Sequence, residues 1–216
     1  MGYQTISLKT GLNLVSTTFD DISGGAADIQ DFLSGDFLPN EELLFYKPGG
    51  GYDRYLYSDN LMDAAWNDLN RPGWGNMSGQ IVTREIKAGD AFWINAKADH
   101  DITISGAVKT NTQVISCTAG LNLVASAFPV ETDANVALVV DGLRENDQLM
   151  VYKQGGGYDR YLYTSNLADA DWKDLNRPGW GNMSGQEVAI PLPPNKAFWI
   201  YTANPSIEIQ IDSPLQ

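Results

Sequence analysis

Cysteine and histidine are almost missing from this 216-residue chain, which contains one of each. A single cysteine excludes an intrachain disulfide, and one histidine with one cysteine is too few for a zinc site. We therefore predict that Cys117 is a small buried apolar residue and that His100 is a solvent-exposed turn residue. No metal or other cofactor is expected.

Positive charge is also scarce, with 14 Lys and Arg against 27 Asp and Glu, for a net charge of -13. Such a chain repels phosphate backbones and anionic membrane surfaces, so nucleic acid is not an expected partner. No apolar run approaches the length of a membrane span, and no membrane insertion is expected. The first residues also lack the basic start and apolar core of a signal peptide, so any leader is absent from this chain.

What the chain does contain is a duplication. Residues 46–80 recur as residues 152–186 with six substitutions, and these two segments are called the matched block. Residues 11–15 recur as 120–124, and residues 91–94 recur as 197–200. The sequence therefore predicts two tandem modules, residues 1–109 and residues 110–216.

Each module has the pattern of a β-rich domain. Apolar residues alternate at Gln4–Ile6–Leu8, as in half-buried strands. Residues 43–46 and 52–57 flank three glycines, which indicates a hairpin. Residues 92–94 and 102–104 are expected to form the last strand pair. The prediction is a mainly β, β-rich α+β chain, with two antiparallel sandwich or barrel-like repeats of about six strands and one short helix each.

The short helix is predicted from apolar spacing. Asp133 is a suitable N-cap in the second module, and Gly35 and Gly142 are suitable stops. The expected buried faces are Ile29, Phe32 and Leu33 in the first module and Val136, Val139, Val140 and Leu143 in the second.

The order of these pieces resembles a known kind of module. A Gly-x-Asn-Leu-Val-Ser strand, a short helix, a Tyr-rich hairpin, a Trp segment, Ala-Phe-Trp-Ile and a closing Ile-Thr-Ile-x-Gly strand cover nearly the whole of each copy. This resembles the tandem-repeat β-rich modules of bacterial secreted or cell-surface proteins, which have no assigned ligand. The resemblance implies an extracellular or cell-surface location. The second copy departs from it at residues 194–196 and at Ser213.

The matched block contains the candidate binding residues. Trp74 and Trp180 each lie in Asn-Arg-Pro-Gly-Trp-Gly-Asn, a run of turn-forming residues with little apolar cover. An aromatic ring beside amide, carboxylate and guanidinium groups is typical of a sugar-binding face. We predict ligand binding by Asp53, Arg54, Trp66, Arg71, Trp74 and Asn76, and by Asp159, Arg160, Trp172, Arg177, Trp180 and Asn182. The alternative is that Trp74 folds back as a plug over the sheet. Trp93 and Trp199, in apolar strands, are expected in the core.

No catalytic residues are predicted, because nothing in the shared carboxylates, including Asp63 and Asp68, demands an acid–base pair across a cleft. The sequence therefore favours a non-catalytic binding module for glycan or another surface protein, in which duplication adds avidity. The alternative is a structural or self-assembling spacer, coat or filament subunit without a small-molecule ligand. In that case the matched block would be an interface between copies or chains.

Overall fold

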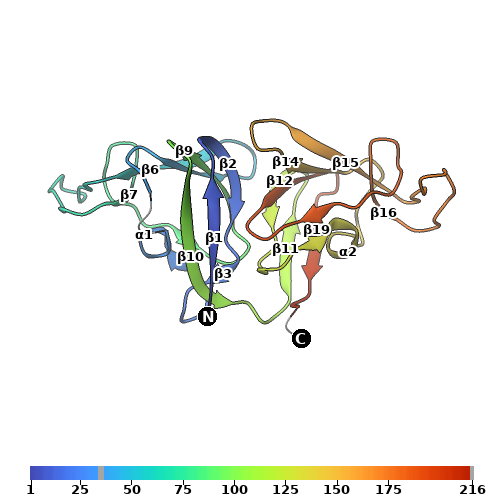
Figure 1. Ribbon diagram of the computed structural model, residues 1–216, viewed down its shortest axis with the longest axis horizontal. Coiled ribbons are helices and arrows are strands. Elements are labelled where there is room, and N and C mark those ends of the chain that lie inside the picture. Colours follow the sequence, from blue (N-terminus) through green and yellow to red (C-terminus); the bar gives the residue numbers. More distant parts are fainter. Residues whose placement is uncertain (34–36, 215–216) are drawn as a thin grey trace.

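A computed structural model describes residues 1–33 and 37–214. The described chain is mainly β, with antiparallel sheets and two short helices, so the predicted fold class is confirmed (Figure 1). The first half contains β1 (Gly2–Leu8), β2 (Gly11–Ser16), β3 (Phe19–Asp20), β4 (Ala27–Asp28), α1 (Ile29–Phe32), β5 (Glu42–Tyr46), β6 (Tyr52–Ser58), β7 (Gly73–Gly75), β8 (Glu85–Ile86), β9 (Ala91–Ala96) and β10 (His100–Val108).

The second half repeats most of this order. It contains β11 (Gln113–Cys117), β12 (Gly120–Ala125), β13 (Thr132–Asp133), α2 (Ala134–Ala137), β14 (Gln148–Tyr152), β15 (Tyr158–Thr164), β16 (Gly179–Gly181), β17 (Pro191–Leu192), β18 (Ala197–Thr202) and β19 (Ile207–Ile211). The predicted module boundary falls in the connection from β10 to β11 and stays a prediction.

A five-stranded sheet dominates each half. Its strand order is β2-β9-β5-β6-β7 in the first half and β12-β18-β14-β15-β16 in the second. The registers also match, since Tyr57 lies opposite Trp74 and Tyr163 lies opposite Trp180. The predicted hairpin is present between β5 and β6. Gly49, Gly50 and Gly51 all have positive φ there, which favours glycine.

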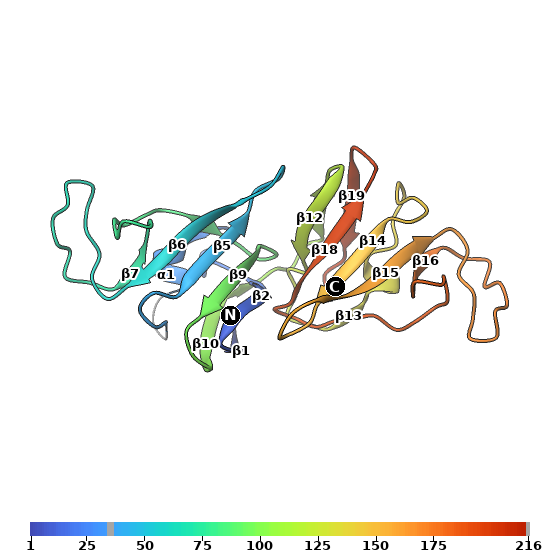
Figure 2. The same cartoon turned by 90° about the horizontal axis from the view of Figure 1, so that it is seen from above.

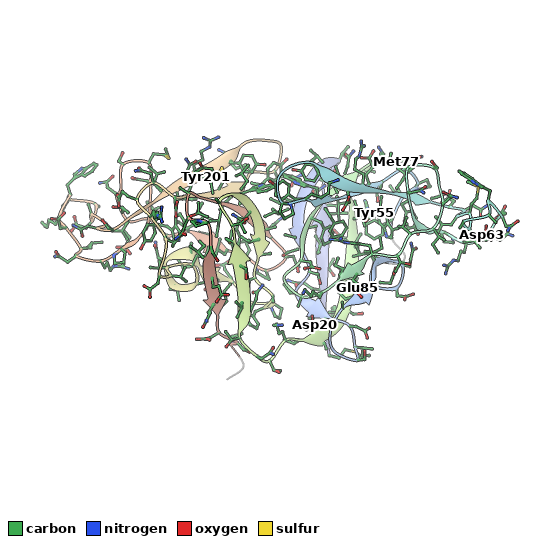
Figure 3. All side chains as sticks on the ribbon, turned by 180° about the vertical axis from the view of Figure 1, so that it is seen from behind. Asp20, Tyr55, Asp63, Met77, Glu85 and Tyr201 are labelled. Atoms are coloured by element: carbon green, nitrogen blue, oxygen red, sulfur yellow. The ribbon has the colours of Figure 1, made fainter. Side chains whose placement is uncertain are left out.

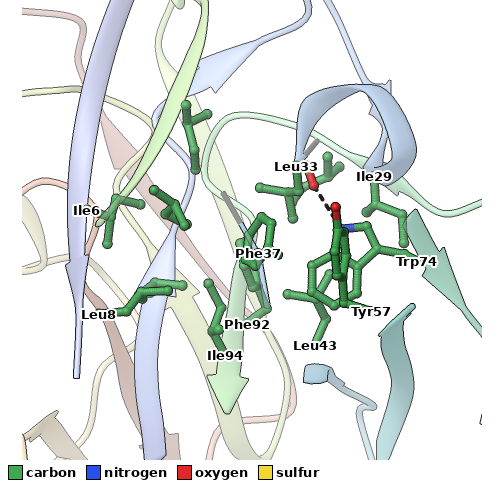
Figure 4. Close-up of a cluster of buried hydrophobic side chains, with 14 of the residues drawn as sticks. Ile6, Leu8, Ile29, Leu33, Phe37, Leu43, Tyr57, Trp74, Phe92 and Ile94 are labelled. Atoms are coloured by element: carbon green, nitrogen blue, oxygen red, sulfur yellow. Dashed lines mark hydrogen bonds between the residues drawn. The ribbon is translucent and has the colours of Figure 1, made fainter. Parts of the chain in front are cut away.

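Smaller sheets cover one face of each large sheet. β10 pairs with β1 and β3, and β11 pairs with β19. The predicted pairing of residues 92–94 with residues 102–104 is wrong, because β9 instead pairs with β2 and β5. The reason is that the chain crosses between layers from β9 to β10. Alternating apolar residues of β1 and β10, such as Ile6 and Ile104, are then buried in the core between the layers. Figure 4 shows Ile6 in this cluster.

Each helix is one turn long and follows an aspartate N-cap. Asp133 is the N-cap of α2, as predicted, and accepts a hydrogen bond from Asn135 N at 2.8 Å. The predicted face of α2 is wrong at Val136, which is 80% exposed, because the turn instead buries Ala134 and Ala137. Val139, Val140 and Leu143 lie beyond the helix and pack against the core.

Of the two predicted helix stops, Gly35 and Gly142, only Gly142 lies in the described residues. The α2 helix ends at Ala137, so Gly142 lies in a later turn and does not stop it. Gly35 falls outside the described residues. In the first half Ile29 and Leu33 are buried and Phe32 packs against the core, as predicted.

The two halves meet through an aromatic cluster. Trp93 and Trp199 lie in it, so their predicted burial is confirmed. The contact is reciprocal: Trp93 meets Tyr152, and Trp199 meets Tyr46, each with ring centroids 4.8 Å apart. Each β-hairpin therefore reaches across to the opposite half, and Figure 2 shows the halves side by side.

Candidate functional site

Trp74 and Trp180 are core residues, not binding residues. Both are 0% exposed, so their predicted place on a ligand-binding face is wrong. The alternative is right about burial, but each tryptophan lies within the sheet, in β7 or β16, and not in a loop over it. The Trp74 indole N–H donates to Leu33 O at 2.9 Å (Figure 4). The Trp180 indole N–H donates to Leu138 O at 3.1 Å. Phe37 packs against the Trp74 ring in an edge-on arrangement at 4.8 Å.

A side-chain amide holds the backbone at each of these tryptophans. Gln30 Oε1 accepts from Trp74 N at 3.0 Å, and Gln30 Nε2 donates to Trp74 O and Val82 O. Asn135 makes the same contacts with Trp180 and Val188. The amide thus takes the place of a neighbouring strand beside the edge strands β7 and β16. Sequence reasoning missed this pair, because neither residue lies in the matched block.

Steric crowding explains why glycine stands on each side of Trp74. A Cβ at Gly73 would lie 2.5 Å from Gln30 Oε1, and one at Gly75 would lie 3.0 Å from Gln80 O. In the second half a Cβ at Gly181 would lie 2.8 Å from Gln186 O. The Gly-Trp-Gly run is therefore required by packing in both halves, and a ligand is not needed to explain it.

Asparagines 76 and 182 anchor turns. Asn76 Oδ1 accepts from Ser78 N at 2.9 Å and from Gln80 N at 3.1 Å, and Asn182 makes the same bonds in the second half. Their side chains are engaged by their own turns. These contacts account for both asparagines without the predicted ligand.

The predicted binding residues Asp53, Arg54, Asp159 and Arg160 lie at the starts of β6 and β15, away from the loops that follow these strands. Asp53 and Asp159 follow the first residues of β6 and β15, next to the contact between the halves, and form ion pairs with Lys47 at 3.4 Å and Lys153 at 3.1 Å. Arg54 pairs with Glu42 at 2.7 Å, whereas in the second half Gln148 stands at the position of Glu42. The structure does not bring these four residues together with Trp66 or Trp172.

Trp66 and Trp172 are the exposed members of the predicted set, at 57% and 62%. Each lies in a long loop between the last two strands of its sheet, residues 61–72 and 167–178, here called the tryptophan loops. These loops extend from opposite ends of the molecule, and Figure 3 labels Asp63 at one outer end. Their exposure leaves the rings free to meet a ligand, and the predicted binding role of this pair stays a prediction.

The turn at each loop tip has a defined hydrogen-bond pattern. Trp66 N donates to Asp63 O at 3.0 Å, and Asp63 N donates to Asn67 O at 2.9 Å. Asp63 Oδ1 also accepts from Ala65 N and Asn67 N. The Asn67 side chain, followed by these N–H groups, lowers the pKa of Asp63. Asp169 makes the same turn around Trp172.

This turn forces tryptophan into a left-handed backbone conformation, with φ 65° at Trp66 and 63° at Trp172. A three-residue hairpin loop of this kind normally has glycine at that position. For a side chain with a Cβ the conformation costs about 1–2 kcal/mol. Both halves have this strained conformation, and both expose a large apolar ring.

The two loops differ on either side of the tryptophan. Ala65 corresponds to Asp171 and Asn67 corresponds to Lys173, and five of the six substitutions of the matched block fall at residues 58–67. The part of the block that varies most thus retains its tryptophan. Neither core packing nor backbone preference accounts for that residue.

Polar side chains accompany each ring on the same loop. Asp68 forms a bridge across the loop to Met62, and its Oδ1 accepts from Asn70 N at 2.8 Å. Asn70 and Arg71 are exposed. Arg177, the counterpart of Arg71, pairs with Glu187, whereas the first half has Ile81 at that position. Each tryptophan loop therefore contains carboxylate, amide and guanidinium groups as well as the indole at its tip.

The remaining chemically reactive residues serve the fold. Cys117 is buried as predicted, and burial raises the pKa of its thiol to about 11. The prediction of an exposed His100 is wrong: it begins β10, and its Nε2 lies 3.4 Å from the buried carboxylate of Glu41. Asp147, the counterpart of Glu41, instead accepts from Thr202 Oγ1 at 2.9 Å.

Comparisons with family models, curated proteins and solved structures each find no match to this chain. Within residues 1–33 and 37–214, no group of three or more His, Cys, Asp or Glu side chains is placed to hold a metal ion. No helix in the same ranges is long and apolar enough to cross a membrane. The tryptophan loops are therefore the feature of the described chain from which a function can be proposed.

Proposed function

We propose that this chain is a non-catalytic extracellular or cell-surface module that binds carbohydrate through Trp66 and Trp172. The observation that carries the proposal is an exposed tryptophan in a left-handed conformation at the tip of both loops. Strain of this kind persists where the surrounding structure imposes it, and it concentrates at functional sites. The two halves retain it while the flanking residues differ.

The chemistry of the loop tip suits a sugar. An indole provides a large flat apolar surface with little conformational entropy to lose, which lets it stack on the apolar face of a pyranose. Asp68, Asn70 and Arg71 offer acceptors and donors for hydroxyl groups close along the same loop. The net charge of -13 disfavours acidic polysaccharides, so the proposed ligand is a neutral glycan.

The test compares the wild-type protein with the double variant Trp66→Ala plus Trp172→Ala on a panel of neutral oligosaccharides, by titration calorimetry and by the indole fluorescence change. We expect wild type to bind at least one member and the double variant to lose at least tenfold in affinity. A matched control is Tyr3→Ala, which removes a 79% exposed aromatic from β1 outside both loops. Circular dichroism checks that both variants remain folded.

Two results would contradict the proposal. One is a wild-type protein that ignores the whole panel. The other is a double variant that binds as tightly as wild type, which would move the site away from the loops.

Self-assembly is the competing function, with the exposed rings as contacts between chains. It predicts oligomers that grow with protein concentration and disappear in the double variant. Light scattering over a range of concentrations separates it from glycan binding. The other aromatics of the matched block already have partners, since Tyr46 and Tyr152 join the two halves of one chain. This favours glycan binding.

A further inference from the structure

The two tryptophan loops lie at opposite ends of an elongated molecule (Figures 1 and 2). The halves meet near β2, β9, β12 and β18, and the strands β6 and β7 lie between that contact and the first loop. β15 and β16 occupy the same place in the second half. At the usual strand spacing, this adds roughly 10 Å of sheet on each side before the loops begin. A short oligosaccharide on one ring therefore cannot reach the other.

The halves are also joined firmly, which keeps the loops apart. The contact buries six side chains from both halves: Leu14, Trp93, Ala125, Met150, Ala197 and Trp199. Tyr152 Oη donates to Leu12 O at 3.2 Å, and Ser16 N donates to Asn195 O at 3.0 Å. The two modules are thus packed against each other and do not swing on a flexible linker.

The contact between the halves is reciprocal, so each half offers the same residues to the other. Trp93 meets Tyr152 in the same way as Trp199 meets Tyr46, and β9 contacts β12 as β18 contacts β2. Such reciprocity is the mark of a two-fold arrangement within one chain. It presents two corresponding tryptophan tips at a constant separation.

We infer that the chain is a cross-linker, which holds two separate segments of a repetitive neutral glycan polymer, one at each tryptophan loop. This inference rests on the proposed function and names its ligand class, a polysaccharide with repeated binding units. One small sugar occupies one loop only. A polymer or a densely glycosylated surface occupies both, and apparent affinity rises without any new contact.

The experiment uses soluble neutral polysaccharides (mannan, xylan, β-glucan and arabinogalactan) together with short oligosaccharides cut from each. Calorimetry on the oligosaccharides counts the sites per chain, and turbidity of protein–polysaccharide mixtures reports cross-linking. The variants are Trp66→Ala, Trp172→Ala and the double variant, with Tyr3→Ala as control. Each single variant removes one loop tip and leaves the other unchanged.

We expect two oligosaccharide sites in wild type and one in each single variant, with an unchanged affinity per remaining site. Wild type and Tyr3→Ala should make the polysaccharide solution turbid near equivalence and clear it again in large excess of protein. The single variants should stay clear and lose about a hundredfold in apparent affinity for the immobilised polymer.

Different outcomes distinguish the two ideas. Two sites in wild type without turbidity, or turbidity that a single variant retains, would overturn cross-linking and leave carbohydrate binding intact. Binding that survives in the double variant, or no binding to any of the polysaccharides, would overturn the proposed function and the cross-linking inference with it.

Discussion

The indole of Trp93 stands edge-on to the ring of Tyr152, with the centroids 4.8 Å apart and the planes at 82°. The two residues belong to different halves of the chain. The reciprocal contact, Trp199 against Tyr46, has the same spacing and a plane angle of 84°. Part of the matched block is thus identical in both halves because its hairpin tyrosines join them.

Removing either tyrosine should weaken the whole protein by a similar amount. We expect Tyr46→Ala and Tyr152→Ala each to lower the free energy of unfolding by about 2 kcal/mol, since both lose an aromatic pair and leave a gap in the cluster. Urea denaturation provides the measurement. Tyr3→Ala, at an exposed position, should change stability by less than about 0.5 kcal/mol. A large difference between the two tyrosine variants would contradict the reciprocal contact.

Two tryptophans eight residues apart should behave in opposite ways. Trp74→Ala empties a fully buried site and should cost about 3–5 kcal/mol. Trp66→Ala removes an exposed ring and should change stability by less than about 0.5 kcal/mol. Thermal or chemical unfolding of both variants checks the ranking. Equal losses would show that the ring of Trp66 is packed.

Because Trp66 has a left-handed backbone conformation, a glycine variant at this position should be more stable than an alanine variant. At most positions glycine is the less stable residue, but at φ 65° it avoids the left-handed penalty. We expect Trp66→Gly to be more stable than Trp66→Ala by about 1 kcal/mol. Chemical denaturation of both variants measures this difference. If alanine is the more stable, the turn does not hold this residue in the left-handed region.

Asp99 predicts a stability change in acid. Its hydrogen bonds with Lys9 and with the N–H and hydroxyl of Thr10 lower the pKa of Asp99 from 3.8 to about 2. Because the folded value is the lower one, its stabilisation is complete above about pH 4 and is lost as pH falls through about 2. Asp99→Asn should therefore melt below wild type at pH 7, and the two melting curves should converge near pH 2. Parallel curves across that range would contradict the assignment.

Local patterns in the sequence were a good guide to local structure. The alternation in β1 and β10 reflects the two-residue period of a strand, and three glycines can only serve a turn such as residues 49–51. The Asp133 N-cap follows from its side-chain chemistry. The pairing partner of each strand was harder to predict from the sequence, because β10 pairs with β1, which lies at the opposite end of the same half in the sequence.

The residues of the candidate site differ in burial, and no local sequence pattern shows which of them are buried. Trp66 and Trp74 both lie in polar, turn-rich segments, yet one ring is exposed and the other is sealed in the core. The difference comes from Gln30, Leu33 and Phe37, which reach Trp74 from a segment some forty residues earlier and have no counterpart at Trp66.

By itself the amino-acid sequence determined the duplication, the strand periodicity and the hairpins, because these depend on the conformations of neighbouring residues. Only the tertiary structure decided which tryptophans are core, which join the halves and which stand at the loop tips. Burial depends on distant segments that meet after folding, and two similar local motifs can meet different partners. The same packing decided that the two loop tips point away from each other, at opposite ends of one molecule.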